Sequence, residues 1–304
     1  MLKIFGHKSP DTDATCSAII WAWYQSAQGN PATPYVLGEP NTEAQFVLKR
    51  WGFDMPELLG PLGAGDPVIV VDTNNPAELP EDIGNATIQE IIDHHLLVGG
   101  LTTSAPINIT MKPIASTASI MMQMMGNDVD TAPEGIKGLI LSCILSDTLE
   151  FRSPTTTEVD KVLAEKLAAD LSLSIPDYAS EMFEAKSDIS AFSDAALLRL
   201  DSKQYGVGGK EFRVSVLETT SPATVLARKD SLMTSMGTVA SEDSVDQVLL
   251  FVVDILNEES TLLVPNDLVK SVAEASFDIQ VSGDLVILPG VVSRKKQIIP
   301  NLKL

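Results

Sequence analysis

The stretch Pro67-Val68-Ile69-Val70-Val71-Asp72 decides the fold class, because an apolar run ends abruptly in a carboxylate. Residues 86–93 repeat this pattern, and Asp93-His94-His95 closes the second run. Continuous apolar strands separated by helices along the chain are typical of a parallel sheet covered on both faces. Open sheets of this kind bind their ligands beyond the carboxyl ends of the strands. We therefore predict an α/β fold with a functional site at these strand ends.

The rest of the chain predicts two domains. Residues 2–5 form a short apolar run that predicts a further strand, with His7 following it. Helices are predicted, from apolar periodicity and from capping and stop residues, at residues 12–28, 41–51, 116–125, 134–145, 159–171 and 175–185. The remainder predicts a smaller unit with strands at residues 212–217, 247–256 and 262–264 and helices at 222–236 and 268–275. We place the domains at residues 1–187 and 188–304.

Composition excludes several classes of function. The chain has 304 residues, 21 Lys and Arg against 41 Asp and Glu, and a net charge of −20. Such a surface repels phosphate backbones and disfavours nucleic-acid binding. We therefore interpret the acidic composition as a means of keeping the protein soluble, or as an adaptation to salt or temperature.

No apolar run reaches membrane-spanning length. Cys16 and Cys143 lie in apolar helical patterns typical of free, buried thiols, and the strand-like start is unlike a signal peptide. A cytoplasmic protein is expected.

All three histidines of the chain lie beside aspartates near predicted strand ends. His7 lies in Gly6-His7-Lys8-Ser9-Pro10-Asp11-Thr12-Asp13, and His94 and His95 follow Asp93. Neutral imidazole combined with carboxylate suits Mn²⁺, Co²⁺, Zn²⁺ or Fe²⁺, whereas all-oxygen sites suit Mg²⁺ and Ca²⁺. The pattern predicts a metal-dependent enzyme.

Each motif also has a purely structural interpretation. An isolated pair such as Asp11 and Asp13 commonly caps a helix, and Asp72 could be an ordinary turn residue. Asp147 could make a structural hydrogen bond near a helix C-terminus, although the helix dipole disfavours a negative charge there. Adjacent histidines after an aspartate are harder to explain structurally. One imidazole could bind metal while the other faces substrate, with Asp93 orienting one of the rings.

Taken together, the carboxylates and imidazoles suffice for two divalent metals, and carboxylates such as Asp72 and Asp147 could bridge them. Water between two such ions has a lowered pKa and is present as hydroxide near neutral pH. Hydroxide can then attack a phosphorus atom. A leaving phosphate needs positive charge, and Ser293-Arg294-Lys295-Lys296-Gln297 is the obvious basic cluster. Taken alone, that cluster would be a solvated tail.

In these motifs the chain closely resembles the manganese-dependent (family II) inorganic pyrophosphatases of the DHH phosphoesterase superfamily. The matching motifs are Gly6 to Asp13, Asp93-His94-His95, Ser146-Asp147-Thr148-Leu149 running into Ser153-Pro154-Thr155-Thr156-Thr157, and Ser293 to Gln297. They span the chain in the family's order, and jointly they are specific, whereas D-H-H alone would indicate only the superfamily. The resemblance implies an N-terminal DHH domain, a C-terminal DHHA2 domain and an active site in the cleft between them.

The resemblance also implies roles for particular residues. One metal would be held by His7, Asp11, Asp72 and Asp147, and the second by Asp13, Asp72, His94 and Asp147. His95, Lys203, Arg294 and Lys295 would bind the substrate and assist catalysis. The implied cofactors are Mn²⁺ or Co²⁺ at two tight sites, with Mg²⁺ accompanying pyrophosphate. A homodimer, and closure of the second domain over the first, are also implied.

One segment departs from the family pattern, and two other functions compete. The family continues the Asp72 strand as V-D-H-N-E, whereas this chain has Thr73-Asn74-Asn75 after Asp72, which implies an altered metal affinity or preference. The first alternative is an exopolyphosphatase or a related DHH phosphoesterase. Nucleases of this superfamily usually carry a Gly-rich motif with histidine in the second domain, and no histidine follows His95 here. The second alternative is a regulator on a decayed scaffold, which the complete ligand set disfavours.

Overall fold

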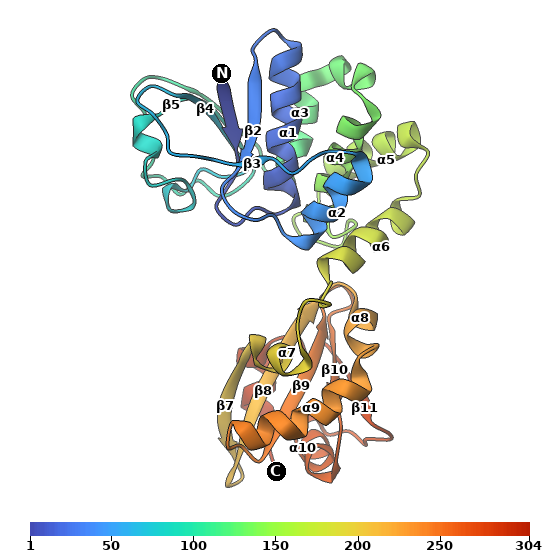
Figure 1. Ribbon diagram of the computed structural model, residues 1–304. Coiled ribbons are helices and arrows are strands. Elements are labelled where there is room, and N and C mark those ends of the chain that lie inside the picture. Colours follow the sequence, from blue (N-terminus) through green and yellow to red (C-terminus); the bar gives the residue numbers. More distant parts are fainter. The chain divides into compact units, whose positions relative to one another are not determined.

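The computed structural model describes all 304 residues, which divide into two compact units, Met1–Ala185 and Lys186–Leu304. Each unit is built around one β-sheet (Figure 1). No helix in the chain combines the length and the apolar character that crossing a membrane requires.

The first unit contains a six-stranded sheet in the order β3-β2-β1-β4-β5-β6, and every neighbouring pair is parallel. The strands are β1 (Leu2–Phe5), β2 (Ala32–Val36), β3 (Glu57–Leu58), β4 (Pro67–Val71), β5 (Thr87–Asp93) and β6 (Asn108–Met111). The three runs predicted from the sequence form the adjacent strands β1, β4 and β5, so the predicted α/β class is confirmed. Their carboxyl ends meet at one edge of the sheet because parallel strands run in the same direction.

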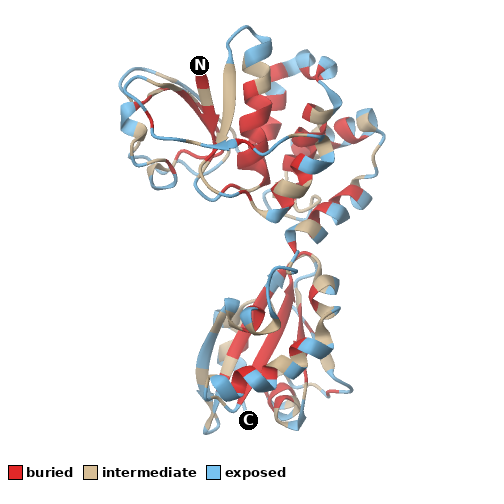
Figure 2. Cartoon of the chain, in the orientation of Figure 1, coloured by how far each residue is buried: buried red, intermediate tan, exposed pale blue.

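Six helices accompany this sheet, at α1 (Thr12–Ala27), α2 (Thr42–Trp51), α3 (Thr117–Met125), α4 (Glu134–Thr148), α5 (Glu158–Leu171) and α6 (Ile175–Lys186). Their starts follow capping chemistry: Asp11 accepts a hydrogen bond from the Ala14 amide, and Thr157 forms a capping box with Asp160. Helix α1 packs along β1 and β2 and is buried at every position from Thr12 to Ala22. Figure 2 shows it as a largely red helix.

The two faces of the sheet are covered differently. Helices α1 and α3 pack against strands on one face. On the other, Phe5, Val68 and Val70 pack with Leu62 and Leu79 from loops. The links from β4 to β5 and from β5 to β6 are loops carrying at most short 3₁₀ turns. Both faces are therefore buried, as predicted, but loops cover one of them.

The second unit holds a five-stranded mixed sheet in the order β11-β10-β9-β8-β7, in which only β8 and β9 are parallel. The strands are β7 (Ser202–Val207), β8 (Lys210–Thr219), β9 (Gln247–Asp254), β10 (Glu259–Leu263) and β11 (Leu285–Pro289). The helices are α7 (Asp194–Leu200), α8 (Pro222–Leu226), α9 (Lys229–Glu242), α10 (Asp267–Phe277) and α11 (Ile299–Asn301).

One predicted helix of this unit is wrong in its extent. Residues 222–236 were expected to form a single helix, but the chain breaks between α8 and α9. Arg228 leaves helical geometry at the break, and its guanidinium donates hydrogen bonds to the Ile189 carbonyl at 3.0 Å and to Asp194 at 2.6 Å. These contacts come from distant residues and are invisible to local periodicity.

Candidate metal centre

The functional residues of the first unit lie where neighbouring parallel strands end. His7 follows β1, Asp72 follows β4, and His94 and His95 follow β5. The register pairs Phe5 with Val70 and Val71 with Ile92, so these strand ends are level. Asp72 adopts a left-handed backbone conformation with φ of 59°, which costs free energy for most residues but is more accessible to Asp. The carboxylate of Asp72 lies between the imidazoles of His7 and His94.

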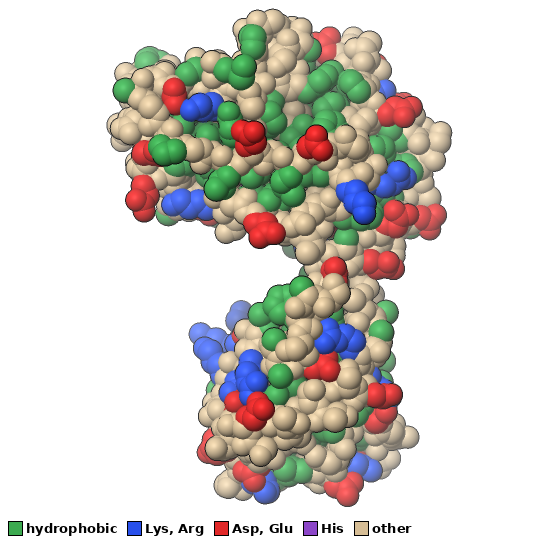
Figure 3. All heavy atoms as spheres, viewed as in Figure 1, with side chains coloured by type: hydrophobic (Ala, Val, Ile, Leu, Met, Phe, Trp, Pro, Cys, Tyr) green, Lys and Arg blue, Asp and Glu red, His purple; other side chains and the backbone are tan.

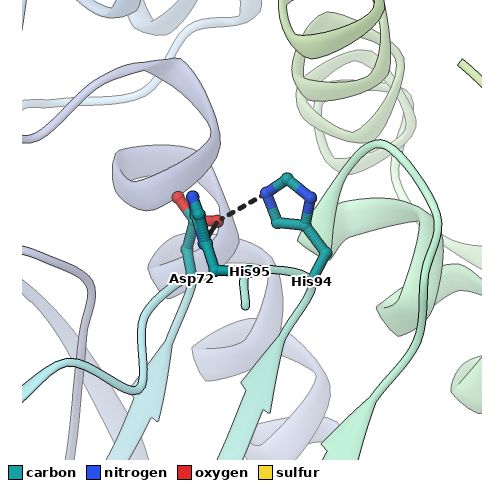
Figure 4. A group of neighbouring side chains, drawn as sticks. All are labelled: Asp72, His94 and His95. Carbon is teal, nitrogen blue, oxygen red and sulfur yellow. Dashed lines mark ion pairs between the residues drawn. The ribbon is translucent and has the colours of Figure 1, made fainter. Parts of the chain in front are cut away.

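Asp72 is the centre of the cluster. Its Oδ1 lies 3.3 Å from Nε2 of His94, and its Oδ2 lies 3.5 Å from Nε2 of His7 (Figure 4 shows Asp72 with His94 and His95). The Thr117 hydroxyl donates a hydrogen bond to Oδ1 at 2.9 Å. A buried carboxylate with a different imidazole at each oxygen has the geometry of a bridging ligand.

The structure brings the predicted metal ligands together in two groups that could each hold an ion. Within each group the donor atoms lie within 4.8 Å of one another. The first group contains His7, Asp11 and Asp72, and the second contains Asp13, His94 and Asp147. Asp72 also forms a third group with His94 and His95. All six predicted ligands therefore belong to one of the first two groups.

The two adjacent imidazoles are oriented by different partners. Nδ1 of His94 lies 3.2 Å from the Ile114 carbonyl, so the Nδ1–H tautomer leaves Nε2 directed at Asp72. Metal-binding histidines are usually oriented in this way. Nδ1 of His95 lies 2.9 Å from Oδ1 of Asp93, and half of the His95 side chain is exposed. Both imidazoles therefore contact carboxylates, but the His95 side chain is 51% exposed whereas that of His94 is 18% exposed.

Asp13 is held by the start of a distant helix. Its carboxylate accepts hydrogen bonds from the Thr117 amide at 2.6 Å, the Ser116 hydroxyl at 3.1 Å and the Ser17 hydroxyl at 3.0 Å. The amide of Ala118 adds a longer contact of 3.3 Å. The N-terminus of α3 thus stabilises negative charge on Asp13. These contacts fix the carboxylate in one orientation.

The acidic groups of the cluster are crowded. Burial and the neighbouring carboxylates of Asp13, Asp11 and Asp72 raise the pKa of Asp147 well above its ordinary value. Burial and Asp72 raise the pKa of Asp13 to about 6. In addition, Oδ2 of Asp147 is buried and accepts no hydrogen bond. A divalent cation would satisfy this oxygen and offset the repulsion, so the donor set fits a metal.

The imidazoles respond in the opposite direction. Burial by itself lowers the pKa of His7, but Asp11 and Asp72 outweigh it and raise that pKa to about 10. His94 behaves similarly, and its pKa is raised to about 9 beside Asp72 and Asp13. Hydrogen bonds from His7 and His94 outweigh burial at Asp72 and lower its pKa. The cluster thus contains the mixed imidazole and carboxylate donors that suit Mn²⁺ or Co²⁺.

The predicted substrate residues of the second unit lie at its surface. Lys203 is exposed on β7, and Lys295 is exposed in the turn that follows Ser293. Arg294 is half-buried, and its guanidinium contacts Asp201 through the carboxylate at 2.7 Å and the carbonyl at 2.9 Å. Figure 3 shows Lys and Arg side chains at the surface of this unit.

Several residues around the cluster were missed by sequence reasoning. Glu43 is buried and accepts hydrogen bonds from the hydroxyls of Thr12 at 2.9 Å and Ser146 at 2.7 Å. Thr73 lies in the segment that departs from the family pattern. Its hydroxyl donates a hydrogen bond to the Glu78 carboxylate at 2.7 Å. Ser116 and Thr117 stand at the start of the helix predicted from residue 116, where a Ser-Thr pair can equally well be a local helix cap. Glu43 gave no signal beyond its place in an amphipathic helix.

Comparisons with known proteins agree across the whole chain. Residues 2–147 match the DHH family, N-terminal domain, and residues 180–304 match the DHHA2 domain. The probable manganese-dependent inorganic pyrophosphatase of Deinococcus radiodurans is 39% identical over 100% of this chain and 98% of its own length. That of Staphylococcus aureus is 38% identical over 98% of this chain and 96% of its own length.

A solved structure gives the same result. The crystal structure of a Methanococcus jannaschii protein assigned to the family II inorganic pyrophosphatases aligns with a TM-score of 0.63 and 33% identity, covering 99% of this chain and 98% of that one. Full-length identity at this level, together with both domain matches, establishes the family. The chain belongs to the manganese-dependent (family II) inorganic pyrophosphatases of the DHH superfamily.

Proposed function

We propose that this chain hydrolyses inorganic pyrophosphate to two phosphates with the help of two divalent metal ions. The observation that carries the proposal is Asp72, whose two oxygens lie beside the imidazoles of His7 and His94. That arrangement suits a carboxylate shared by two ions. The relatives named as manganese-dependent inorganic pyrophosphatases support the same reaction and Mn²⁺ as the metal.

In this proposal the first ion would be held by His7, Asp11, Asp72 and Asp147, and the second by Asp13, Asp72, His94 and Asp147. Two such ions, when bound, lower the pKa of water and neutralise charge on a phosphate. Co²⁺ is an alternative to Mn²⁺ because both accept imidazole and carboxylate ligands. Mg²⁺ would accompany the substrate, since it prefers phosphate oxygens and water.

The chain's own residues have separate tasks in the reaction. Asp93 accepts a hydrogen bond from Nδ1–H of His95 and raises the pKa of that imidazole, which favours its doubly protonated form. In that form Nε2–H of His95 can donate a hydrogen bond or a proton to a phosphate oxygen. Lys203, Arg294 and Lys295 would supply positive charge to the phosphates. The proposal requires these second-unit cations to reach a substrate held by the first unit.

Phosphate release from pyrophosphate by the Mn²⁺-loaded protein tests the proposal. We expect turnover at least about 1000-fold above that of a His94→Ala, Asp147→Ala double variant, because such a variant lacks a ligand of each type. Equal release by the two proteins would refute the proposal. Parallel assays on tripolyphosphate and longer chains separate a pyrophosphatase from an exopolyphosphatase, which would turn over the longer chains faster.

A homodimer is the second part of the proposal. Strand β6 forms the edge of the first-unit sheet, and its Ile109 side chain is 56% exposed. Leu96, Leu97 and Val98 are also exposed apolar residues. A second copy of the chain would cover such a surface and pair the edge strand. Sedimentation equilibrium should show a dimer that Ile109→Lys converts to a monomer. An unchanged mass for the variant would place the interface elsewhere.

A cytoplasmic location remains a prediction, supported by the free, buried Cys16 and Cys143.

A further inference from the structure

Asn74 is a buried polar residue beside the proposed site, and both the nitrogen and the oxygen of its side-chain amide make hydrogen bonds. It is 5% exposed and lies two residues beyond Asp72. Its Nδ2 donates to Oδ2 of Asp93 at 2.5 Å and to the Leu96 carbonyl at 3.0 Å. Its Oδ1 accepts the Val98 amide at 2.8 Å. One amide group thus binds the residues on both sides of His95.

The partner of Asn74 is in turn the partner of His95. Asp93 is completely buried, and its second oxygen accepts both Nδ1 of His95 at 2.9 Å and the His95 backbone amide at 3.1 Å. A buried carboxylate needs hydrogen-bond donors on both oxygens to remain fixed. Asn74 provides the donor at the oxygen that does not face His95.

We propose that Asn74 is a positioning residue, which fixes the His95 imidazole through Asp93 and through the backbone of residues 96–98. The inference rests on the proposed function, because His95 is the group proposed to meet the phosphate. Loss of the amide would free one oxygen of Asp93 and both backbone contacts of the segment after His95. Loss of the residues that orient metal-binding histidines typically costs about 10–100-fold in activity, and we expect a similar loss for a histidine that meets the substrate.

The neighbouring asparagine provides a matched control. Asn75 is half-buried, and its Oδ1 accepts the Ala77 amide at 3.1 Å at the start of a 3₁₀ turn. Its side chain makes no hydrogen bond to Asp93 or to residues 95–98. Asn75→Ala therefore removes the same chemical group one residue away without touching His95.

The experiment compares full-length Asn74→Ala, Asn74→Asp, Asn75→Ala, His95→Ala and the Asn74→Ala, His95→Ala double variant, each checked for folding by thermal unfolding. Asn74→Asp preserves size but replaces the donor by a carboxylate that repels Asp93. We expect both Asn74 variants to lower kcat for pyrophosphate by about 10–100-fold, with Mn²⁺ affinity and KM within about 3-fold of wild type. Asn75→Ala should remain within about 2-fold of wild type.

The double variant distinguishes positioning from a general structural role. If Asn74 acts through His95, adding Asn74→Ala to His95→Ala should cost little further activity, because the two losses are not independent. Independent, multiplicative losses would overturn the inference. So would an Asn74→Ala variant that behaves like Asn75→Ala, or one that loses Mn²⁺ affinity in proportion to kcat.

A spectroscopic measurement keeps this inference separate from the proposed function. Wild-type protein that released no phosphate would refute the proposed function but not the placement of His95. In the Mg²⁺-loaded protein, the Nδ1–H proton of His95 should give a protected NMR signal in wild type and in Asn75→Ala. The signal should disappear through solvent exchange in Asn74→Ala and Asn74→Asp. A signal that persists in both Asn74 variants would refute the positioning role, whatever the activity.

Discussion

The two units of the chain differ in how far the charged side chains of the proposed site are buried. In the first, carboxylates and imidazoles are crowded at strand ends, and Asp13 and Asp72 are buried and held by several hydrogen bonds. In the second, Lys203 and Lys295 are exposed. Buried like charges are costly without a counterion, whereas exposed cations remain hydrated at little cost. This difference fits the proposed function, in which the first unit would hold metal ions at fixed positions and the exposed cations of the second would attract an anion.

Removing a buried carboxylate of the first unit should have the largest effect. Asp147→Asn takes away one ligand, and we expect Mn²⁺ affinity to fall at least about 100-fold and turnover to fall with it. The metal-free variant should unfold at a higher temperature than metal-free wild type at pH 7. The raised pKa of Asp147 means that its ionised form is disfavoured in the folded protein, so this penalty grows as pH rises above about 4.

Calorimetric Mn²⁺ titration and thermal unfolding with and without metal measure both effects of Asp147→Asn. A variant that binds Mn²⁺ like wild type would contradict the metal assignment.

Removing a cation of the second unit should separate the two kinds of site. Arg294→Ala is expected to lower turnover about 100-fold, because a charge that stabilises the transition state is lost. Mn²⁺ binding should be unchanged, since Arg294 lies in the other unit. Lys296→Ala removes the same charge from the same turn and should cost less than about 3-fold. Steady-state kinetics decide the point, and equal effects of the two substitutions would leave Arg294 without a special role.

Glu43 tests whether the buried cluster depends on support from outside its ligands. Its carboxylate binds the hydroxyl of Thr12, between Asp11 and Asp13, and that of Ser146, beside Asp147. We expect Glu43→Ala to weaken Mn²⁺ binding about 10-fold, because both ligand-bearing segments lose an acceptor. The exposed Glu39 supplies a control, and Glu39→Ala should leave Mn²⁺ affinity unchanged. Identical titrations for the two variants would show that the ligands hold their own positions.

The smallest effect concerns the paired charges of the second unit. The Arg199 guanidinium, with Arg213, holds the pKa of Asp243 below its ordinary value through contacts of 2.6–3.2 Å. A lowered folded-state pKa adds stability above pH 4, and that stability is lost as pH falls through the folded pKa. Asp243→Asn should therefore destabilise by about 1 kcal/mol at pH 7 and by progressively less toward pH 2. Thermal unfolding across this range measures the difference, and a pH-independent difference would exclude the ion pairs as its cause.

Much of the first unit could be predicted because its signals are local. Apolar runs that end in Asp72 and Asp93 indicated parallel strands, and Asp11 marked the start of a helix by its capping chemistry. Parallel strands bring their carboxyl ends to one edge of the sheet, so strand direction places His7, Asp72 and His94 at that edge. They meet there because β1, β4 and β5 are neighbours in the sheet. The motifs of the family resemblance extended these predictions to the second unit.

The sequence by itself determined the fold class and which side chains gather at the strand ends, because hydrophobic pattern and strand direction are written in neighbouring residues. Only the tertiary structure decided how those side chains are held. Thr117 reaches Asp13 across 104 positions, and Asn74 reaches Asp93 across 19. Ser, Thr and Asn serve equally well as helix caps and turn residues, so their distant partners depend on packing. The break at Arg228 has the same origin, since its partners Ile189 and Asp194 are distant in sequence.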